Sequence, residues 1–259
     1  MTEVNSLLAL TTAQTVLEVA GNPLVQVPDG YRVQDLEDYL PTPRRMRQRV
    51  VLLSAASFIA YCVRFANTGT TILADSESNS LQAVIDHAVT SAEPTWNDHR
   101  ASYRCELSKA WKIWQKYDGQ TLGQEQFAEL LEDRAADVVN PTGAELLEIA
   151  TKFQVIRKAV FGSAMRLATG EFQFNYSDEN EKGTIEVPEL ITLGLAPFHN
   201  GDSYEVQARL RYRLREGKLT FTFKLVNPER VVEDAFNSIV EKVKEGVSVA
   251  HVLDGYPLD

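Results

Sequence analysis

The sequence predicts an α+β fold, in which an antiparallel β-sheet built from C-terminal hairpins carries helices on one face. Residues 204–226 form two runs in which apolar and polar side chains alternate, as is typical of half-buried strands. Residues 108–154 and 228–246 instead carry apolar side chains at helical spacing and begin with capping residues. Strands and helices therefore occupy separate stretches of the chain, which favours an α+β arrangement.

The two alternating runs are predicted to form a hairpin around Glu216-Gly217, because glycine supplies the positive φ of a tight turn. Pairing Arg215 with Lys218 sets the register. In this register the apolar residues pair on one face: Leu214 with Leu219, Tyr212 with Phe221, and Leu210 with Phe223.

Residues 1–27 are predicted to form an N-terminal helical arm, because a leucine-rich stretch ends at Gly21-Asn22-Pro23. Its apolar content suggests an arm that docks, on the same or a neighbouring subunit. Residues 28–107 follow as an αβ portion. Here Ser54 is expected to cap a helix, and strands are expected at residues 70–74, 81–89 and 99–107.

Residues 108–154 form a helical segment in this interpretation. Ser108 is expected to cap a helix with Trp111 and Trp114 on one side, a second helix covers residues 124–139, and Thr142-x-x-Glu145 fits the capping box of a third.

Residues 155–246 are predicted to be an antiparallel sheet followed by a C-terminal helix. A hairpin is expected at residues 159–176, and residues 184–198 read as one long strand, kinked at Pro188 or Gly194. Asn227 and Pro228 start the last helix. We expect helices 108–154 and 228–246 on one face of this sheet, residues 247–259 as a tail, and the αβ portion either within the sheet or as a second lobe.

The composition limits the function classes. The net charge of −10 disfavours binding of the whole surface to nucleic acid or to an anionic membrane, although a local basic site remains compatible with it. The N-terminus lacks the basic run of a secretory signal, and the longest apolar stretch is shorter than the ~20 residues of a membrane span. Cys62 and Cys105 are typical of reduced core thiols in a cytosolic protein.

Five phrases of the chain resemble the YfdQ-like family of phage and prophage proteins, a family of unknown function. They are PTPRRMRQRV (41–50), PTWNDHRASY (94–103), QFAELLED (126–133), GTIEVPEL (183–190) and ARLRYRLREGKLTF (208–221). The resemblance implies a phage or prophage origin and action in the cytoplasm of the bacterial host. It supplies no activity and no functional residue.

The first candidate site is the outer face of the predicted hairpin, where four arginines recur at every second residue and so stand ~6.6 Å apart. They are Arg209, Arg211, Arg213 and Arg215, with Lys224 opposite Arg209. Like charges so close together favour an acidic partner surface. The alternatives are a solvated strand face, contact with an acidic patch of another copy, and binding of nucleic-acid phosphate.

The second candidate is a basic run after Pro41-Thr42-Pro43, formed by Arg44, Arg45, Arg47 and Arg49. It would hold a phosphate backbone or dock on an acidic segment of a neighbour, formed by Asp35, Glu37 and Asp38. The plainer interpretation is an edge strand whose charges discourage aggregation.

The third candidate is a polar cluster of His87 and His99, near Trp96, if residues 81–89 and 99–107 pair around Glu93-Pro94. Two ligands are fewer than the three or four that a metal ion needs, so a structural histidine pair is favoured over a metal site.

The sequence contains none of the common nucleophile, phosphate-loop, dinucleotide or metalloprotease motifs, and we expect no catalytic site, metal or cofactor. The leading hypothesis is a non-enzymatic accessory protein that assembles into a symmetric homo-oligomer. The alternatives are a nucleic-acid-binding protein of phage replication or recombination, and a takeover factor that binds a bacterial host protein. No membrane partner is expected.

Overall fold

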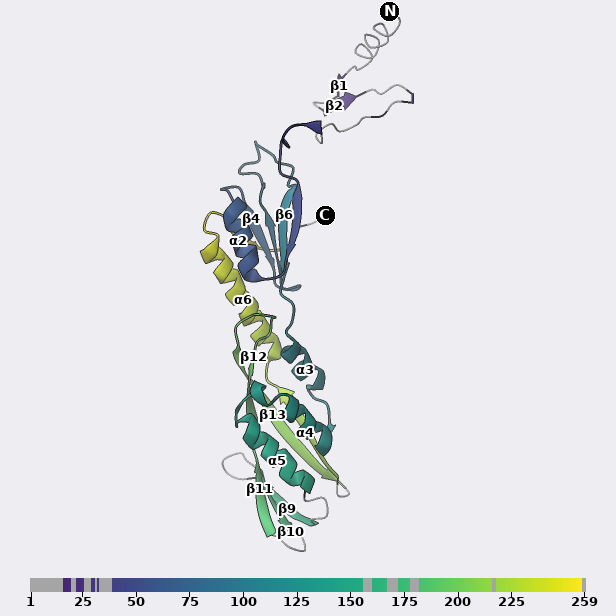
Figure 1. Cartoon of the computed structure of the whole chain (residues 1–259), viewed down its shortest axis with the longest axis vertical. Coiled ribbons are helices and arrows are strands. Elements are labelled where there is room, and N and C mark those ends of the chain that lie inside the picture. The colour runs from purple at the N-terminus through teal and green to yellow at the C-terminus, as the bar shows by residue number, and fades with distance from the viewer. Residues whose placement is uncertain are drawn as a thin grey trace, which may run out of the picture. The chain divides into compact units, whose positions relative to one another are not determined.

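The structure is a computed structural model that describes residues 16–19, 22–25, 29–30, 32, 39–155, 160–166, 172–177, 182–215 and 218–257. It divides into two units, residues 1–47 and residues 48–259, which are described separately. The second unit combines helices with mostly antiparallel sheets (Figure 1), which confirms the predicted α+β class.

The first unit contains a pair of antiparallel strands, β1 (Val16–Val19) and β2 (Asn22–Val25). The predicted helical arm is therefore wrong over these residues, whereas residues 1–15 lie outside the described part of the chain. Valines at positions 16, 19 and 25 favour extended backbone, and the two residues between the strands match the length of a hairpin connection.

The second unit contains a five-stranded antiparallel sheet in the order β7-β14-β13-β12-β8. Its strands are β7 (Leu122–Gly123), β8 (Val138–Asn140), β12 (Leu190–Leu195), β13 (Tyr204–Arg215) and β14 (Lys218–Leu225). Strands β13 and β14 pair Arg215 with Lys218 and Tyr212 with Phe221, so the predicted register is confirmed. A shift of one residue would have separated the apolar residues onto opposite faces, and the two-residue turn selects this register among the rest.

Helices cover one face of this sheet (Figure 1). They are α3 (Lys109–Tyr117), α4 (Gln124–Asp133) and α5 (Gly143–Val155), with a short 3-10 turn η2 (Ala135–Asp137). Ser108 caps α3 and Thr142 forms the predicted capping box with Glu145. Helix α4 ends before the predicted residue 139, because Val138 pairs with Leu193 of β12. We call the buried residues between these helices and the sheet the first core.

A second five-stranded sheet has the order β15-β4-β5-β6-β3. Its strands are β3 (Gln48–Leu52), β4 (Thr71–Asp75), β5 (Ser80–Val84), β6 (His99–Arg104) and β15 (His251–Asp254). The three inner strands are antiparallel, whereas β3 pairs parallel with β6 and β15 pairs parallel with β4. Residues 247–259 are therefore not simply a tail, since four of them extend this sheet.

Helices α2 (Ala55–Phe65) and α6 (Pro228–Gly246) pack on the second sheet and enclose its own core. The expected position of helix 228–246, on the sheet of residues 155–226, is wrong. Phe236, Ile239 and Val243 of α6 lie instead among the buried residues of this second core, together with Phe58 and Cys62 of α2. An apolar stripe specifies that a helix face is buried without specifying the sheet that buries it.

A three-stranded antiparallel sheet has the order β11-β10-β9, formed by β9 (Val160–Arg166), β10 (Phe172–Ser177) and β11 (Lys182–Val187). The pairing of β9 with β10 confirms the hairpin expected at residues 159–176. The single strand predicted at 184–198 is two strands, because β11 pairs with β10 and β12 pairs with β13. The break falls at Pro188, which has no N–H for a sheet ladder.

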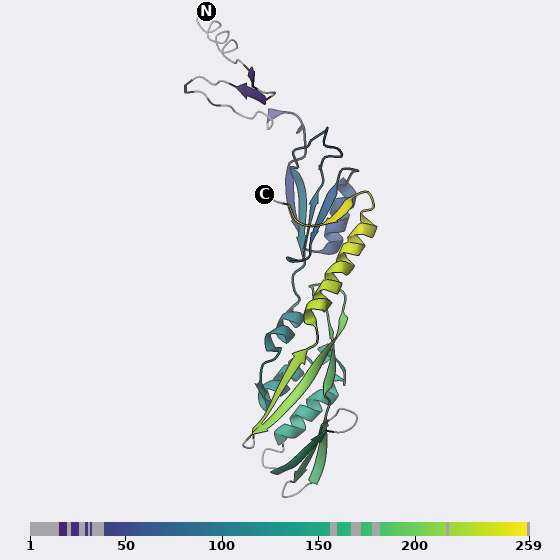
Figure 2. The same cartoon turned by 180° about the vertical axis from the view of Figure 1, so that it is seen from behind.

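The first core is thus built from residues 107–225, and the second core mainly from the segments on either side of them, together with Phe198 and Tyr204. Two backbone contacts lie where the two cores meet: Leu107 forms a β-bridge with Phe198, and the N–H of Ser108 donates to the carbonyl of Pro197 at 2.8 Å. Figure 2 shows the reverse side, where α6 continues from β14 toward the second sheet.

Candidate functional site

The outer face of the first sheet carries exposed basic side chains. Inward-pointing residues such as Leu210 and Phe223 are buried against the helices, so their strand neighbours point outward. We call this outward surface the arginine face; it comprises Arg209, Arg211, Arg213, Lys224, Thr220 and Thr222. From behind, β13 and β14 lie in front of the helices that cover their other face (Figure 2).

The cations of the arginine face differ in their partners. Lys224 pairs with Arg209 across the strands as predicted, and its Nζ lies 2.6 Å from Oδ2 of Asp118. Within the described residues, no hydrogen bond or ion pair involves the side chains of Arg209, Arg211 or Arg213, all of which are exposed. Arg215 ends β13, and its side chain lies outside the described part. Three guanidinium groups are therefore available to a partner.

Two of the three helices on the other side of this sheet have acidic outer surfaces, whereas α3 exposes Lys109, Lys112 and Lys116. Helices α4 and α5 bury their apolar residues in the first core and expose carboxylates outward. We call this surface the acidic helix face; it comprises Glu125, Glu129, Glu132, Asp133, Glu145 and Glu148. Residues from separate helices form this face, so the spacing of acids along the sequence did not single it out.

The second candidate run lies mainly in the first unit. Arg44 and Arg47 are exposed, Arg45 is half-buried, and all three interact with other groups of the chain. Arg49 is exposed on β3, which is an edge strand of the second sheet. The acidic partners proposed for this run, Asp35, Glu37 and Asp38, lie outside the described residues.

The two histidines of the third candidate have different partners. His99 is 4% exposed, and its Nε2 lies 2.7 Å from the hydroxyl of Tyr61. His87 is exposed, with Nδ1 3.0 Å from Oγ1 of Thr71. The pairing of Val84 with Arg100 puts Ile85 near His99 instead, so the expected histidine pair is wrong. Trp96 nearby is exposed.

Burial and a nearby carboxylate act on the pKa of His99 in opposite directions. Removal from water lowers the pKa of His99, while the Asp86 carboxylate opposes this by raising the pKa. That carboxylate also accepts hydrogen bonds from the backbone N–H groups of Asp98 and His99, both at 3.0 Å. Among the residues described, no cluster of three or more His, Cys, Asp or Glu side chains could hold a metal ion.

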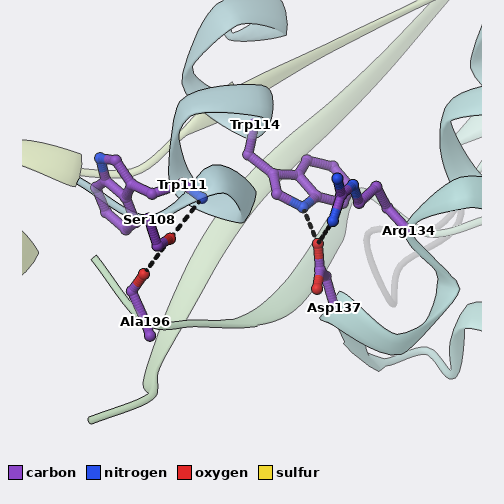
Figure 3. Close-up of polar contacts among 6 residues, drawn as sticks. All are labelled: Ser108, Trp111, Trp114, Arg134, Asp137 and Ala196. Atoms are coloured by element: carbon purple, nitrogen blue, oxygen red, sulfur yellow. Dashed lines mark hydrogen bonds and ion pairs between the residues drawn. The ribbon is translucent and has the colours of Figure 1, made fainter. Parts of the chain in front are cut away.

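A polar network that the sequence did not reveal fixes the helices of the first core (Figure 3). The indole N–H of Trp114 donates to Oδ2 of Asp137 at 2.9 Å, and Arg134 lies 4.0 Å from the same oxygen. Ser108 accepts from the N–H of Trp111 and donates to the carbonyl of Ala196 at 2.6 Å. These contacts hold α3 against η2 and the end of β12, and so serve the fold.

Two hollows adjoin the second sheet. One of about 160 Å³ contains Tyr103, His199, Asp202 and Lys242. Lys242 Nζ lies 2.6 Å from Asp202 Oδ2, so these two charges bind each other. A second of about 420 Å³ lies at the end of β3, beside the exposed Val51 and Leu53. One sequence feature could have located this second hollow: residues 50–53 are all apolar, although a strand with one buried face should alternate apolar and polar side chains.

The cysteines are not activated nucleophiles. Burial raises the pKa of Cys62 to about 12 and that of Cys105 to about 11, so both remain thiols at neutral pH. Over the described helices, none has the length and apolar character that crossing a bilayer requires.

Comparison with known proteins adds a family. The profile of a family described as "Uncharacterized conserved protein (DUF2303)" matches residues 2–255. No curated protein and no solved structure matches the chain. Both five-stranded sheets and the arginine face fall within the matched residues. Because the profile spans nearly all of the sequence, the chain belongs to this uncharacterised conserved family.

Proposed function

We propose that the protein is a non-enzymatic accessory protein of a phage or prophage, which assembles with further copies of itself. The resemblance of five sequence phrases to phage and prophage proteins supports the first part. The second part rests on one observation: the arginine face and the outer surface of α4 and α5, which lie on opposite sides of the first sheet, carry opposite charge.

The arginine face favours an acidic partner on electrostatic grounds. Neighbouring guanidinium groups about 6.6 Å apart repel each other, and a carboxylate-rich surface relieves that repulsion. Arginine is also suited to carboxylates because its planar group donates two parallel hydrogen bonds. Glu129, Glu132 and Asp133 of the acidic helix face offer such carboxylates on every copy of the chain.

The geometry of this contact sets the type of assembly. The arginine face and the acidic helix face are different surfaces, so the contact between copies is heterologous. Heterologous contacts close into a ring when the rotation between subunits permits, and otherwise continue as a filament. The charge pattern also fixes the relative orientation of the copies and excludes contact between two acidic faces.

The test is a measurement of mass in solution by mass photometry or light scattering at micromolar concentration. We expect oligomers at low ionic strength that dissociate as salt is raised, because exposed charges are screened beyond about 10 Å at 0.1 M salt. Arg211→Glu should shift the population to smaller species. Adding Glu129→Arg to the same chain should restore part of the assembly.

Arg64→Glu on the exposed side of α2 is the matched control, since it makes the same change of net charge on a helix of the second core, away from the first sheet and its helices. It should leave the mass distribution unchanged. A wild-type chain that does not associate at low salt, or an Arg211→Glu chain that assembles like the wild type, would contradict the proposal.

A second candidate, binding of nucleic acid, is favoured by a separate feature of the same face. The hydroxyls of Thr222 and Thr220 lie opposite Arg211 and Arg213, and both groups commonly bind phosphate oxygens. This function predicts binding to single- or double-stranded DNA at low salt, with a salt slope that Arg211→Ala reduces. Failure to bind either form at low salt would remove it.

A further inference from the structure

Strand β3 is an edge strand with unusual exposed residues. It pairs with β6 on one side, and within the described part of the chain no strand pairs with its other side. Val51 is 74% exposed and Leu53, which follows the strand, is 87% exposed. Edge strands of natural proteins are commonly protected by charge, proline or bulges, whereas residues 50–53 are all apolar.

The hollow of about 420 Å³ lies at the C-terminal end of this strand. Val51, Leu53, Arg104 and Glu106 are among the residues that line it. Glu106 is exposed, and the described residues provide no ion pair for its carboxylate. The edge therefore combines an open row of backbone groups, an apolar side-chain surface and one acceptor of positive charge.

We propose that β3 pairs with β3 of a second copy, antiparallel and about a two-fold axis that passes through Val51. The axis places Val51 opposite Val51 of the second copy. It also places Val50 opposite Leu52, on the side of the sheet where Leu52 already packs against the second core. Apolar residues thus face apolar residues on both sides of the sheet.

The charges near the axis do not oppose this register. Arg49 of one copy lies opposite Leu53 of the other, at the rim of the hollow that contains Glu106. The guanidinium group therefore enters a hollow whose lining includes one carboxylate, that of Glu106, and one cation, Arg104, so the register rests mainly on its apolar pairs. The two Arg49 residues lie four positions apart along the ladder, about 13 Å, so their mutual repulsion is weak.

A second copy fits this edge better than an unrelated strand because the sequence complements itself. A two-fold axis uses one short run twice, and the run Arg49–Leu53 has its apolar centre at the axis and its charge at the end. The pairing joins two five-stranded sheets into one continuous sheet and removes an exposed edge from each.

This contact deepens the assembly proposal, yet it uses none of the residues of the arginine face. The two contacts also differ in their response to salt. Backbone hydrogen bonds and apolar contacts persist when salt screens surface charge, so a dimer should remain at about 1 M salt, where the screening length is about 3 Å. Arg211→Glu should leave that dimer intact.

The first test is oxidative cross-linking of the full-length protein. Two cysteines directly opposite each other in an antiparallel pair have Cα atoms about 4.5–5.5 Å apart, which a disulfide spans. Val51→Cys should therefore give a covalent dimer. Leu53→Cys is the matched control, because the axis puts the two copies of residue 53 about 13 Å apart. The native Cys62 and Cys105 are buried and do not compete.

The second test uses charge at the axis. Val51→Glu and Val51→Lys should each weaken the dimer by about tenfold or more, since like charges then face each other. Mixing the two variants in equal amounts should restore it. The same substitutions at Val63, an exposed residue of α2, should have no effect.

A Val51→Cys chain that does not cross-link would overturn the proposal, as would cross-linking of Leu53→Cys to the same extent. Failure of the mixed Glu and Lys variants to recover dimer would do so as well. Because residue 51 is exposed, circular dichroism of each variant should match the wild type, which separates lost pairing from lost folding.

Discussion

The two five-stranded sheets of this protein share a plan and differ in chemistry. Each buries one face beneath helices. The first is antiparallel throughout, and its open face presents arginine, lysine and threonine. In the second, each of the two edge strands pairs parallel with its inner neighbour, and the edge at β3 exposes valine and leucine. One sheet is therefore suited to charged contacts that salt weakens, and the other to backbone pairing that salt leaves intact.

The largest expected effects are losses of stability from substitutions in the two cores, which should differ in how they change tryptophan fluorescence. Phe223 is fully buried in the first core, with its ring 5.2 Å from that of Trp114, and Phe58 is fully buried in the second. Either substitution to alanine should cost about 3–5 kcal/mol of the local core stability. Trp111 and Trp114 both lie in the first core, so tryptophan fluorescence reports mainly on it.

We therefore expect Phe223→Ala to lower the fluorescence-detected unfolding midpoint in denaturant strongly. Phe58→Ala should lower it much less, while it shifts the transition seen by circular dichroism. Equal shifts of the fluorescence midpoint for the two variants would show that the two cores unfold as one cooperative unit. The prediction that they have separate stabilities would then be wrong.

A smaller effect is expected at the two serine caps. Ser54 accepts from the N–H of Ser57 and donates to the hydroxyl of the same residue, so it contacts only its own helix α2, whereas Ser108 both caps α3 and donates to the distant backbone carbonyl of Ala196. Ser54→Ala should cost about 1 kcal/mol, and Ser108→Ala about 1–2 kcal/mol because a carbonyl also loses its donor. Chemical denaturation of both variants measures the difference, and an equal loss would contradict a role for Ser108 beyond capping.

The smallest expected effect is a pH dependence confined to the second sheet. Burial lowers the pKa of His99, so the folded state resists protonation of a group that the unfolded chain protonates below pH 6.5. Its contribution to stability is therefore complete above pH 6.5 and lost as the pH falls toward the lower folded-state value. The opposing charge of Asp86 keeps this loss small.

Unfolding free energies measured between pH 8 and about pH 5 check this prediction, since histidine changes charge in that range. The wild type should lose more stability on acidification than a His99→Gln variant, whose amide can still bond to Tyr61. Identical pH profiles would show that His99 does not contribute. Tyr61 itself stays protonated throughout, because burial raises its pKa further.

The sequence predicted local features well because local rules govern them. Alternation and a glycine turn determined the register of β13 with β14, and hydroxyl or capping-box residues located the starts of α2, α3 and α5. The same alternation placed Arg209, Arg211 and Arg213 outward. These predictions depend on neighbours along one strand or one helical turn.

The features that failed depend on partners far along the chain. The parallel pairing of β15 with β4 joins residues near 252 to residues near 72. Parallel strands are not connected by a short turn, so no turn residues in the sequence indicate this pair. The burial of α6 in the second core and the split of residues 184–198 between two sheets have the same origin. The acidic helix face likewise combines two helices that only the fold brings together.

The order of segments in the chain has a consequence for biosynthesis. The second core needs α2 and β4 from early in the sequence and α6 from late in it, with roughly 120 intervening residues that form the first core. A ribosome takes on the order of ten seconds to add that many residues. During this interval the nascent early segment lacks its covering helix, so a chaperone that shields apolar strands should engage it until translation reaches α6.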